Sequence, residues 1–196
     1  MKKSFPLLAL TVLAMLSSCA AIREHREQIK KAEVNVSETQ EISLFEWNTP
    51  GLTGKPSVRI DLSDQKAYVM DNGQEVAWTY VASGVAGRST PTGRFTIMEK
   101  VADKHSNIWG IIVDANGDMI NSDAHSSRSP IPKGGRFVGA PMPNWMRLTS
   151  YGIGMHAGVI PDPGFPASHG CIRLPEGMAA MMFEHLPEGT PVEVTP

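Results

Sequence analysis

The sequence predicts a mainly β protein, and three observations support this fold class. Glycine and proline are frequent, at 18 and 15 of 196 residues, which favours many turns between short strands. Apolar and polar residues alternate from Val58 to Leu62, with the period of a half-buried strand. Further along, Asp71-Asn72-Gly73 follows a second apolar run, and asparagine and glycine tolerate the positive φ of a tight hairpin.

Residues 1–19 are predicted to be a lipoprotein signal peptide. Two lysines precede an apolar run from Phe5 to Leu16, which is shorter than the ~20 residues of a membrane-spanning helix. The run ends in Leu16-Ser17-Ser18-Cys19, which resembles the lipobox of bacterial lipoproteins. This resemblance implies lipid attachment at Cys19 and a membrane-held protein of the cell envelope that faces the periplasm. Ala20 stands where an inner-membrane retention signal carries Asp, so the outer membrane is the expected destination in an organism that has one.

Two alternatives to lipid attachment stay open. The segment could be an ordinary signal peptide in which Cys19 is incidental. Cys19 and Cys171 are the only two cysteines, so a disulfide between them is the other alternative. Their separate motif contexts argue against that disulfide.

Residues 20–55 are predicted to be a tether. The stretch 21–33 is rich in helix formers and charge but has few apolar positions, so a short exposed helix is expected there. Phe45 and Trp47 are the residues that would dock on the following domain. The turn-forming stretch Asn48-Thr49-Pro50-Gly51 then breaks the chain.

The main domain is expected to occupy residues 56–196. Strands are predicted at residues 58–62, 67–70, 76–82, 95–98, 108–113 and 191–194, and a helix is predicted from Pro175 to Leu186. Residues 116–144 are irregular and rich in glycine, proline and serine, which predicts a long functional loop. His105 and His125 are expected to be surface residues in polar loops.

Composition argues against a nucleic-acid partner. The formal net charge is −2, and no basic patch is evident along the chain. Hydrophobic residues make up 41% and charged residues 19%, which is ordinary for a globular protein.

The chemistry-bearing stretch is Ser168-His169-Gly170-Cys171, which contains the only cysteine of the expected domain. A thiol becomes a useful nucleophile beside a base or a cation, and His156 and His169 are the candidates for that base. Gly170 permits a sharp bend that leaves amides beside the sulfur uncovered, and such amides stabilise an oxyanion. These residue types therefore indicate acyl transfer through a covalent intermediate.

In this motif and three further blocks, the chain resembles the L,D-transpeptidases with a YkuD-type catalytic domain. The further blocks are Thr90-Pro91-Thr92-Gly93-Arg94-Phe95, Ala140-Pro141-Met142-Pro143 and Gly152-Ile153-Gly154-Met155-His156. The resemblance covers residues 56–196 and implies a β-sandwich-like mixed sheet folded over on itself. One helix would follow the catalytic strand, and a long flap loop would line the substrate.

This resemblance implies that peptidoglycan is the substrate, and no cofactor is expected. Cys171 would attack the third residue of a stem tetrapeptide, release D-Ala and hold a thioester. An amine from another stem, a lipoprotein lysine, a free D-amino acid or water would then resolve the thioester. The resemblance also implies that carbapenems acylate Cys171.

The same resemblance suggests roles for the two histidines. His156 is expected to be the general base, because the family holds this imidazole against the sulfur through a backbone carbonyl that belongs here to Ala157. Ala157 stands where glycine is commoner in the family, but it keeps the carbonyl. His169 is expected to be a secondary catalytic residue that orients the site.

The remaining expected site residues surround the sulfur. Ser168 is expected to orient the site by hydrogen bonds, and the amides of Gly170 and Cys171 are the candidates for an oxyanion hole. Arg173, which some family members replace by Asn, would bind a substrate carboxylate or form a structural ion pair. Trp145 either lines the cleft or packs in the core.

Three rival functions stay open. His156, His169 and Cys171 resemble a zinc-ligand set, although no fourth ligand is evident. The chain could also be a wall-binding lipoprotein without activity. Finally, the same acyl chemistry could end on water, which would make the protein a carboxypeptidase or an endopeptidase.

Overall fold

The computed structural model describes residues 23–28 and 42–196. Residues 23–28 form a short helix with exposed side chains, which lies within the stretch expected to be helical. The predicted signal peptide and its Cys19 lie outside the described residues. The main folded unit comprises Ser43–Pro196.

No helix among the described residues is long and apolar enough to cross a membrane.

Six strands form the first sheet, and two of them form a hairpin that was predicted from the sequence. In spatial order they are β1 (Phe45–Trp47), β4 (Gln74–Tyr80), β3 (Lys66–Asp71), β2 (Pro56–Asp61), β11 (Pro191–Thr195) and β5 (Gly93–Thr96). Strand β11 runs parallel to β2, and the other neighbours are antiparallel, so the sheet is mixed. Asn72 and Gly73 have φ of 51° and 80° and close the turn between β3 and β4, as their residue types predicted.

Five strands form the second sheet, which carries the candidate site. In spatial order they are β10 (Ile172–Leu174), β9 (Gly154–Ala157), β8 (Arg136–Arg147), β6 (Glu99–Val113) and β7 (Met119–His125). Strands β10 and β9 are parallel, and the other pairs are antiparallel. Helix α2 (Glu176–His185) begins directly after Pro175, which confirms the predicted helix after the catalytic strand.

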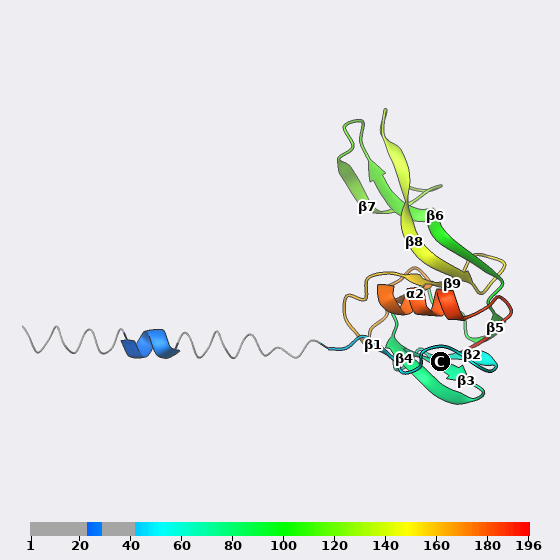
Figure 1. Cartoon of the computed structure of the whole chain (residues 1–196). Coiled ribbons are helices and arrows are strands. Elements are labelled where there is room, and N and C mark those ends of the chain that lie inside the picture. The colour runs from blue at the N-terminus through cyan, green and yellow to red at the C-terminus, as the bar shows by residue number, and fades with distance from the viewer. Residues whose placement is uncertain (1–22, 29–41) are drawn as a thin grey trace, which may run out of the picture. The chain divides into compact units, whose positions relative to one another are not determined.

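Strand structure replaces most of the predicted flap loop. Residues 119–125 and 136–147 are strands β7 and β8. Strand β7 and the outer parts of β6 and β8 form an arm (residues 106–140) that extends beyond α2 (Figure 1). His105 and His125 accordingly lie in strands β6 and β7 rather than in loops. These strands were missed because β7 is exposed on both faces over much of its length and β8 is mostly half-buried, so neither shows a clear period-two alternation. Strand β6 also has register shifts against both neighbours.

The core lies between the two sheets, with α2 in contact with β8 and β9 of one sheet and β1 of the other (Figure 1). Met178, Ala179 and Met182 of α2 are fully buried and form part of this core. Phe45 and Trp47 pack against this core, so the sheet includes part of the stretch expected to be a tether. A Cβ at Gly177 would lie 2.8 Å from the Phe45 ring, so glycine lets α2 approach β1 without displacing that ring.

Candidate active site

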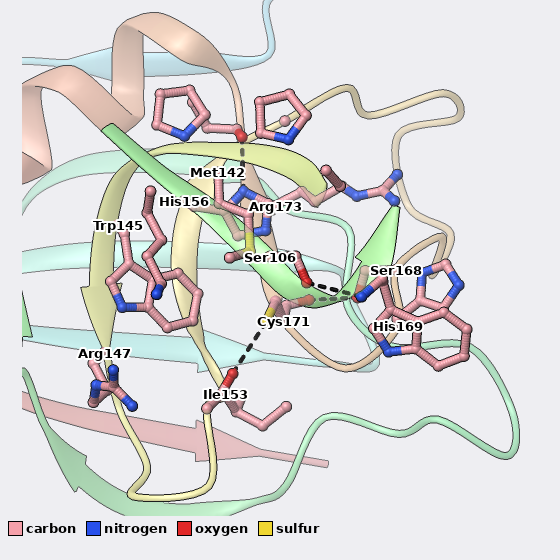
Figure 2. Close-up of a pocket in the computed structure, with 18 of the residues that line it drawn as sticks. Ser106, Met142, Trp145, Arg147, Ile153, His156, Ser168, His169, Cys171 and Arg173 are labelled. Carbon is pink, nitrogen blue, oxygen red and sulfur yellow. Dashed lines mark hydrogen bonds between the residues drawn. The ribbon is translucent and has the colours of Figure 1, made fainter. Parts of the chain in front are cut away.

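The parallel pairing of β10 with β9 brings Cys171 and His156 to one face of the sheet. Arg173 is the register partner of His156, and Cys171 lies two residues before Arg173, directly ahead of β10. Alternate residues of a strand face the same side, so Cys171, Arg173 and His156 share a face. All three line one cavity of about 1070 Å³, and Figure 2 shows the Cys171 and His156 side chains in its wall.

The imidazole of His156 is fixed and neutral. The side chain is buried, with 6% of its surface exposed, and Nδ1 lies 2.8 Å from the Ala157 carbonyl oxygen. The hydrogen bond expected between these two residues is therefore present. An Nδ1–H that donates to the carbonyl leaves Nε2 as the proton acceptor. Burial lowers the pKa of His156 to about 4, against the opposing effect of the Ala157 hydrogen bond, so the ring is ready to take a proton at neutral pH.

The thiol of Cys171 is also neutral. Burial raises its pKa above the ordinary value, and this effect outweighs the backbone hydrogen bond from Gly154 and the charge of Arg173. Its Sγ lies 3.8 Å from the Gly152 carbonyl oxygen, the contact drawn as a dashed line in Figure 2. A thiol and an imidazole that are both neutral suit concerted base catalysis, in which the proton leaves as the sulfur attacks.

Ser168 closes the turn that presents Cys171. Its Oγ accepts a hydrogen bond from the Gly170 N–H at 3.1 Å and donates one to the Cys171 carbonyl. Gly170 has φ of +117°, which favours glycine, and a Cβ there would also press on Ile153 Cδ1 at 3.0 Å. The Gly170 amide was expected to be an oxyanion donor, but it is engaged by Ser168. The Cys171 amide stays the candidate.

His169 turns away from the thiol. Its Nε2 lies 2.6 Å from Asp123 Oδ1 of β7, and its ring centroid lies 4.2 Å from that of Trp109 of β6. Figure 2 shows the side chain pointing away from Cys171. His156 and Cys171 therefore lie on one face of the sheet, whereas the Nε2 of His169 is bonded to Asp123. Within the part of the chain that the structure describes, no three His, Cys, Asp or Glu residues are grouped so that they could hold a metal ion.

Comparison with protein families decides the relationship of this chain to known proteins. The family model of the YkuD L,D-transpeptidase catalytic domain matches residues 55–194. The chain belongs to this family. Comparison with curated protein sequences gives no significant match.

Solved structures of L,D-transpeptidases share the fold of this YkuD domain. An enzyme from Mycobacterium smegmatis is 20% identical with a TM-score of 0.55, over 72% of this chain and 59% of that one. A mutant enzyme from Enterococcus faecium is 24% identical with a TM-score of 0.54, over 72% of this chain and 50% of that one. LdtMt1 in complex with imipenem is 24% identical with a TM-score of 0.52, over 71% of this chain and 58% of that one. The chain thus spans only half to three fifths of these proteins.

Within the YkuD domain, the contacts of Thr90 show what the block that begins at Thr90 contributes to the site. Its Oγ1 accepts a hydrogen bond from the Gly84 N–H at 2.9 Å and donates one to the Gly170 carbonyl at 2.8 Å. The threonine is 5% exposed, so both contacts are shielded from water. Thr90 therefore links the loop after β4 to the turn that carries Cys171.

Gln65 supports the same turn of the YkuD domain from behind, and sequence reasoning missed it. Its side-chain amide binds both the hydroxyl and the backbone N–H of Ser83, each at 2.8 Å, and the residue is 3% exposed. The Ser83 carbonyl accepts hydrogen bonds from the N–H groups of Ala167 and Ser168. In the sequence Gln65 is a polar residue of a turn, and nothing there distinguishes it from a solvated one.

Arg173 and Trp145 also line the cavity. The stem of Arg173 packs on Gly158, where a Cβ would lie 3.0 Å away, and the guanidinium reaches the Val159 carbonyl at 3.5 Å. No carboxylate of the described residues forms an ion pair with Arg173, so the ion-pair alternative finds no partner there. Trp145 is 1% exposed and lines the cavity from within the core, so both of its expected positions apply.

Proposed function

We propose that this protein is a peptidoglycan L,D-transpeptidase in which Cys171 is the nucleophile and His156 the general base. The observation that carries the proposal is the register of β10 on β9, which puts both residues on one face in the wall of a large cavity. The hydrogen bond from His156 Nδ1 to the Ala157 carbonyl supports the assignment, because it aims the free nitrogen away from the backbone.

The first half-reaction forms a thioester. His156 Nε2 takes the thiol proton as Sγ bonds to the carbonyl carbon of the third stem residue, which is a diamino acid. The carbonyl oxygen becomes an oxyanion beside the Cys171 amide. Collapse of this intermediate breaks the amide C–N bond, and the imidazolium returns its proton to the departing nitrogen of D-Ala. The acyl group stays on sulfur.

The second half-reaction passes the acyl group to an acceptor. An amine gives a proton to His156 Nε2 while its nitrogen bonds to the thioester carbon, and the C–S bond then breaks. Sulfur leaves as thiolate and regains the proton from the imidazolium. An amine of a second stem yields a crosslink, a lipoprotein lysine attaches a protein to the wall, and a free D-amino acid exchanges the terminal residue. Water in place of the amine yields a tripeptide.

Arg173 is proposed to bind a substrate carboxylate. Its guanidinium lines the cavity, is partly buried, and has no carboxylate partner among the residues described by the structure. Partial burial makes a bidentate pair with a carboxylate stronger than at an exposed site. Trp145 is proposed to contribute apolar wall to the same cavity.

Incubation with purified muropeptides tests the proposal. The full-length protein and Cys171→Ala are incubated with tetrapeptide muropeptides, and the products are analysed by mass spectrometry. Dimers that lack one D-Ala, formed by the parent alone, are the expected result. Tripeptides without dimers would show that the acyl group passes to water, so the protein would be a hydrolase and not a transpeptidase. Products that persist in Cys171→Ala would overturn the mechanism, and the absence of any product with the parent would favour a binding protein.

A further inference from the structure

Four side chains from separate segments lie in contact at the turn that carries Cys171, which we call the catalytic turn. We call them the clasp: Arg88 in the loop after β4, Trp109 on β6, Asp123 on β7 and His169 in the turn. His169 Nε2 lies 2.6 Å from Asp123 Oδ1, and an Arg88 amine lies 3.5 Å from Asp123 Oδ2. The Arg88 guanidinium also lies 4.2 Å from the centre of the Trp109 ring, on which the His169 ring packs.

We infer that Asp123 is a positioning residue that locks the arm onto the catalytic turn and so holds Cys171 in place. The inference rests on the proposed function of Cys171. His169 stands two residues before Cys171 in a short turn, so a displacement of His169 moves the sulfur. Asp123 and Trp109 both belong to the arm, and Trp109 also lines the cavity. One carboxylate therefore fixes the nucleophile relative to the wall that faces it.

The carboxyl group of Asp123 is ionised, so both of its oxygens can accept hydrogen bonds. Burial alone would raise its pKa, but the hydrogen bond and charge of His169 and the charge of Arg88 outweigh burial, so the pKa lies below its ordinary value. The carboxylate is therefore ionised at neutral pH. A carboxylate can only accept a hydrogen bond, so His169 Nε2 must carry the proton. That nitrogen is consequently unable to take the proton of the thiol, and His169 orients the turn rather than acting as base through Nε2.

The clasp is more than an isolated surface ion pair. A single exposed pair contributes little, because water screens it and both side chains must be ordered. Here the His169 side chain is mostly covered, with 27% exposed, and its ring packs against the tilted Trp109 ring as well as binding the carboxylate. The two oxygens of Asp123 hold two different segments, so removing them releases both segments at once.

The test compares two aspartates of the arm in the full-length protein. Asp123→Ala removes the clasp carboxylate, whereas Asp118→Ala removes an exposed carboxylate whose side chain has no hydrogen-bond or ion-pair partner among the described residues. Asp123→Asn keeps an acceptor oxygen. The readouts are the saturating rate and half-saturating concentration for acylation of Cys171 by a carbapenem, the unfolding temperature, and the tautomer of His169 from ¹⁵N NMR.

We expect Asp123→Ala to lower the saturating acylation rate about tenfold, since small misplacements of a reacting atom are costly. Asp118→Ala should match the parent, and Asp123→Asn should recover part of the loss. The protonated Nε2 of His169 should be seen in the parent and become a mixture of tautomers in Asp123→Ala. An Asp123→Ala protein that acylates like the parent, after correction for the folded fraction, would overturn the inference.

A double-mutant cycle separates the clasp from other roles of its members. If Asp123 acts through His169, Asp123→Ala combined with His169→Gln should lose no more rate than the worse single variant. Losses that multiply would show independent roles and would also overturn the inference. A parent protein that is not acylated at all would instead refute the proposed function, and the ¹⁵N tautomer comparison would still report whether Asp123 fixes His169.

Discussion

At the candidate nucleophile and base, burial acts on both residues in the same direction, toward the neutral form. It raises the pKa of Cys171 and lowers the pKa of His156 to about 4. A preformed thiolate–imidazolium pair is therefore disfavoured, and the sulfur must lose its proton during attack. This arrangement protects the thiol from reagents that need a standing thiolate, because little thiolate is present at neutral pH.

The pH dependence of acylation follows from these two pKa values. The imidazole must be neutral to accept a proton, so the parent should keep its rate as pH falls until about pH 4, where His156 becomes protonated. In His156→Ala the reaction needs thiolate formed in advance, and the raised pKa of Cys171 makes that form scarce. The variant should be ~10²–10⁴-fold slower at neutral pH and should gain rate with rising alkaline pH.

Stopped-time mass spectrometry of acylation by a neutral acyl donor, from pH 4 to pH 10, measures both profiles. Circular dichroism at each pH confirms that the proteins stay folded. A His156→Ala protein with the flat neutral profile of the parent would contradict the assignment of the base.

Carbapenem acylation tests the nucleophile directly. A strained lactam offers an acyl donor, and one L,D-transpeptidase of this fold was solved in complex with imipenem. We expect one covalent adduct per chain in the parent and none in Cys171→Ala, as measured by intact mass and located by peptide mapping. An adduct on a different residue would reject Cys171 as the reactive group.

Residue-level prediction from sequence succeeded where contacts are local. The bond between His156 and Ala157, which the family resemblance implied, joins neighbours, and the Ser168–Cys171 motif spans four residues. Asp123 could not be found in this way, because it reaches His169 across 46 positions. The sequence also did not indicate that the Ser168 hydroxyl accepts the Gly170 N–H, one of the two amides named as oxyanion candidates.

Among the elements, the loop after β4 packs directly against the catalytic turn. A Cβ at Gly84 would lie 2.0 Å from the Arg88 carbonyl oxygen and 2.8 Å from Gly170 Cα. No side chain fits there without moving the loop or the turn. The strand at residues 108–113 was predicted and lies in β6, but β7 and β8 were expected to be loop, because their residues show no clear apolar alternation.

Gly84→Ala should therefore weaken both stability and acylation. Overpacking at such a site costs about 1–3 kcal/mol, and the displaced turn should slow acylation by at least tenfold. Gly51→Ala is the matched control, because a Cβ there meets nothing within 4 Å. Urea unfolding and carbapenem acylation measure the two effects. If Gly84→Ala and Gly51→Ala had the same stability and the same acylation rate, the close contact at Gly84 would not matter for the function of the catalytic turn.

For the whole molecule, we propose that the N-terminal segment sets the cellular location of the protein. Lipid attachment at Cys19 is a proposal, motivated by the lipobox-like Leu16-Ser17-Ser18-Cys19. It would hold the YkuD domain at a membrane facing the cell wall, and the outer membrane is the proposed site in an organism that has one.

Labelled palmitate supplied to cells should enter the parent protein and be lost from Cys19→Ser, whereas Cys171→Ser should label like the parent. The two variants differ only in which cysteine is removed. Equal labelling of Cys19→Ser and the parent would refute the anchor.

The interrupted pairing of β6 has a mechanical consequence. Its 15 residues span roughly 50 Å when extended, from Glu99 beside the core to Val113 in the arm. Pairing with β8 lapses between His105 and Gly110, and the residues in this gap, 106–109, form one wall of the cavity. Fewer ladder hydrogen bonds to β8 resist bending at this gap than along the rest of β6, so we expect the arm to bend there first. Such bending would change the width of the cavity while the core stays packed.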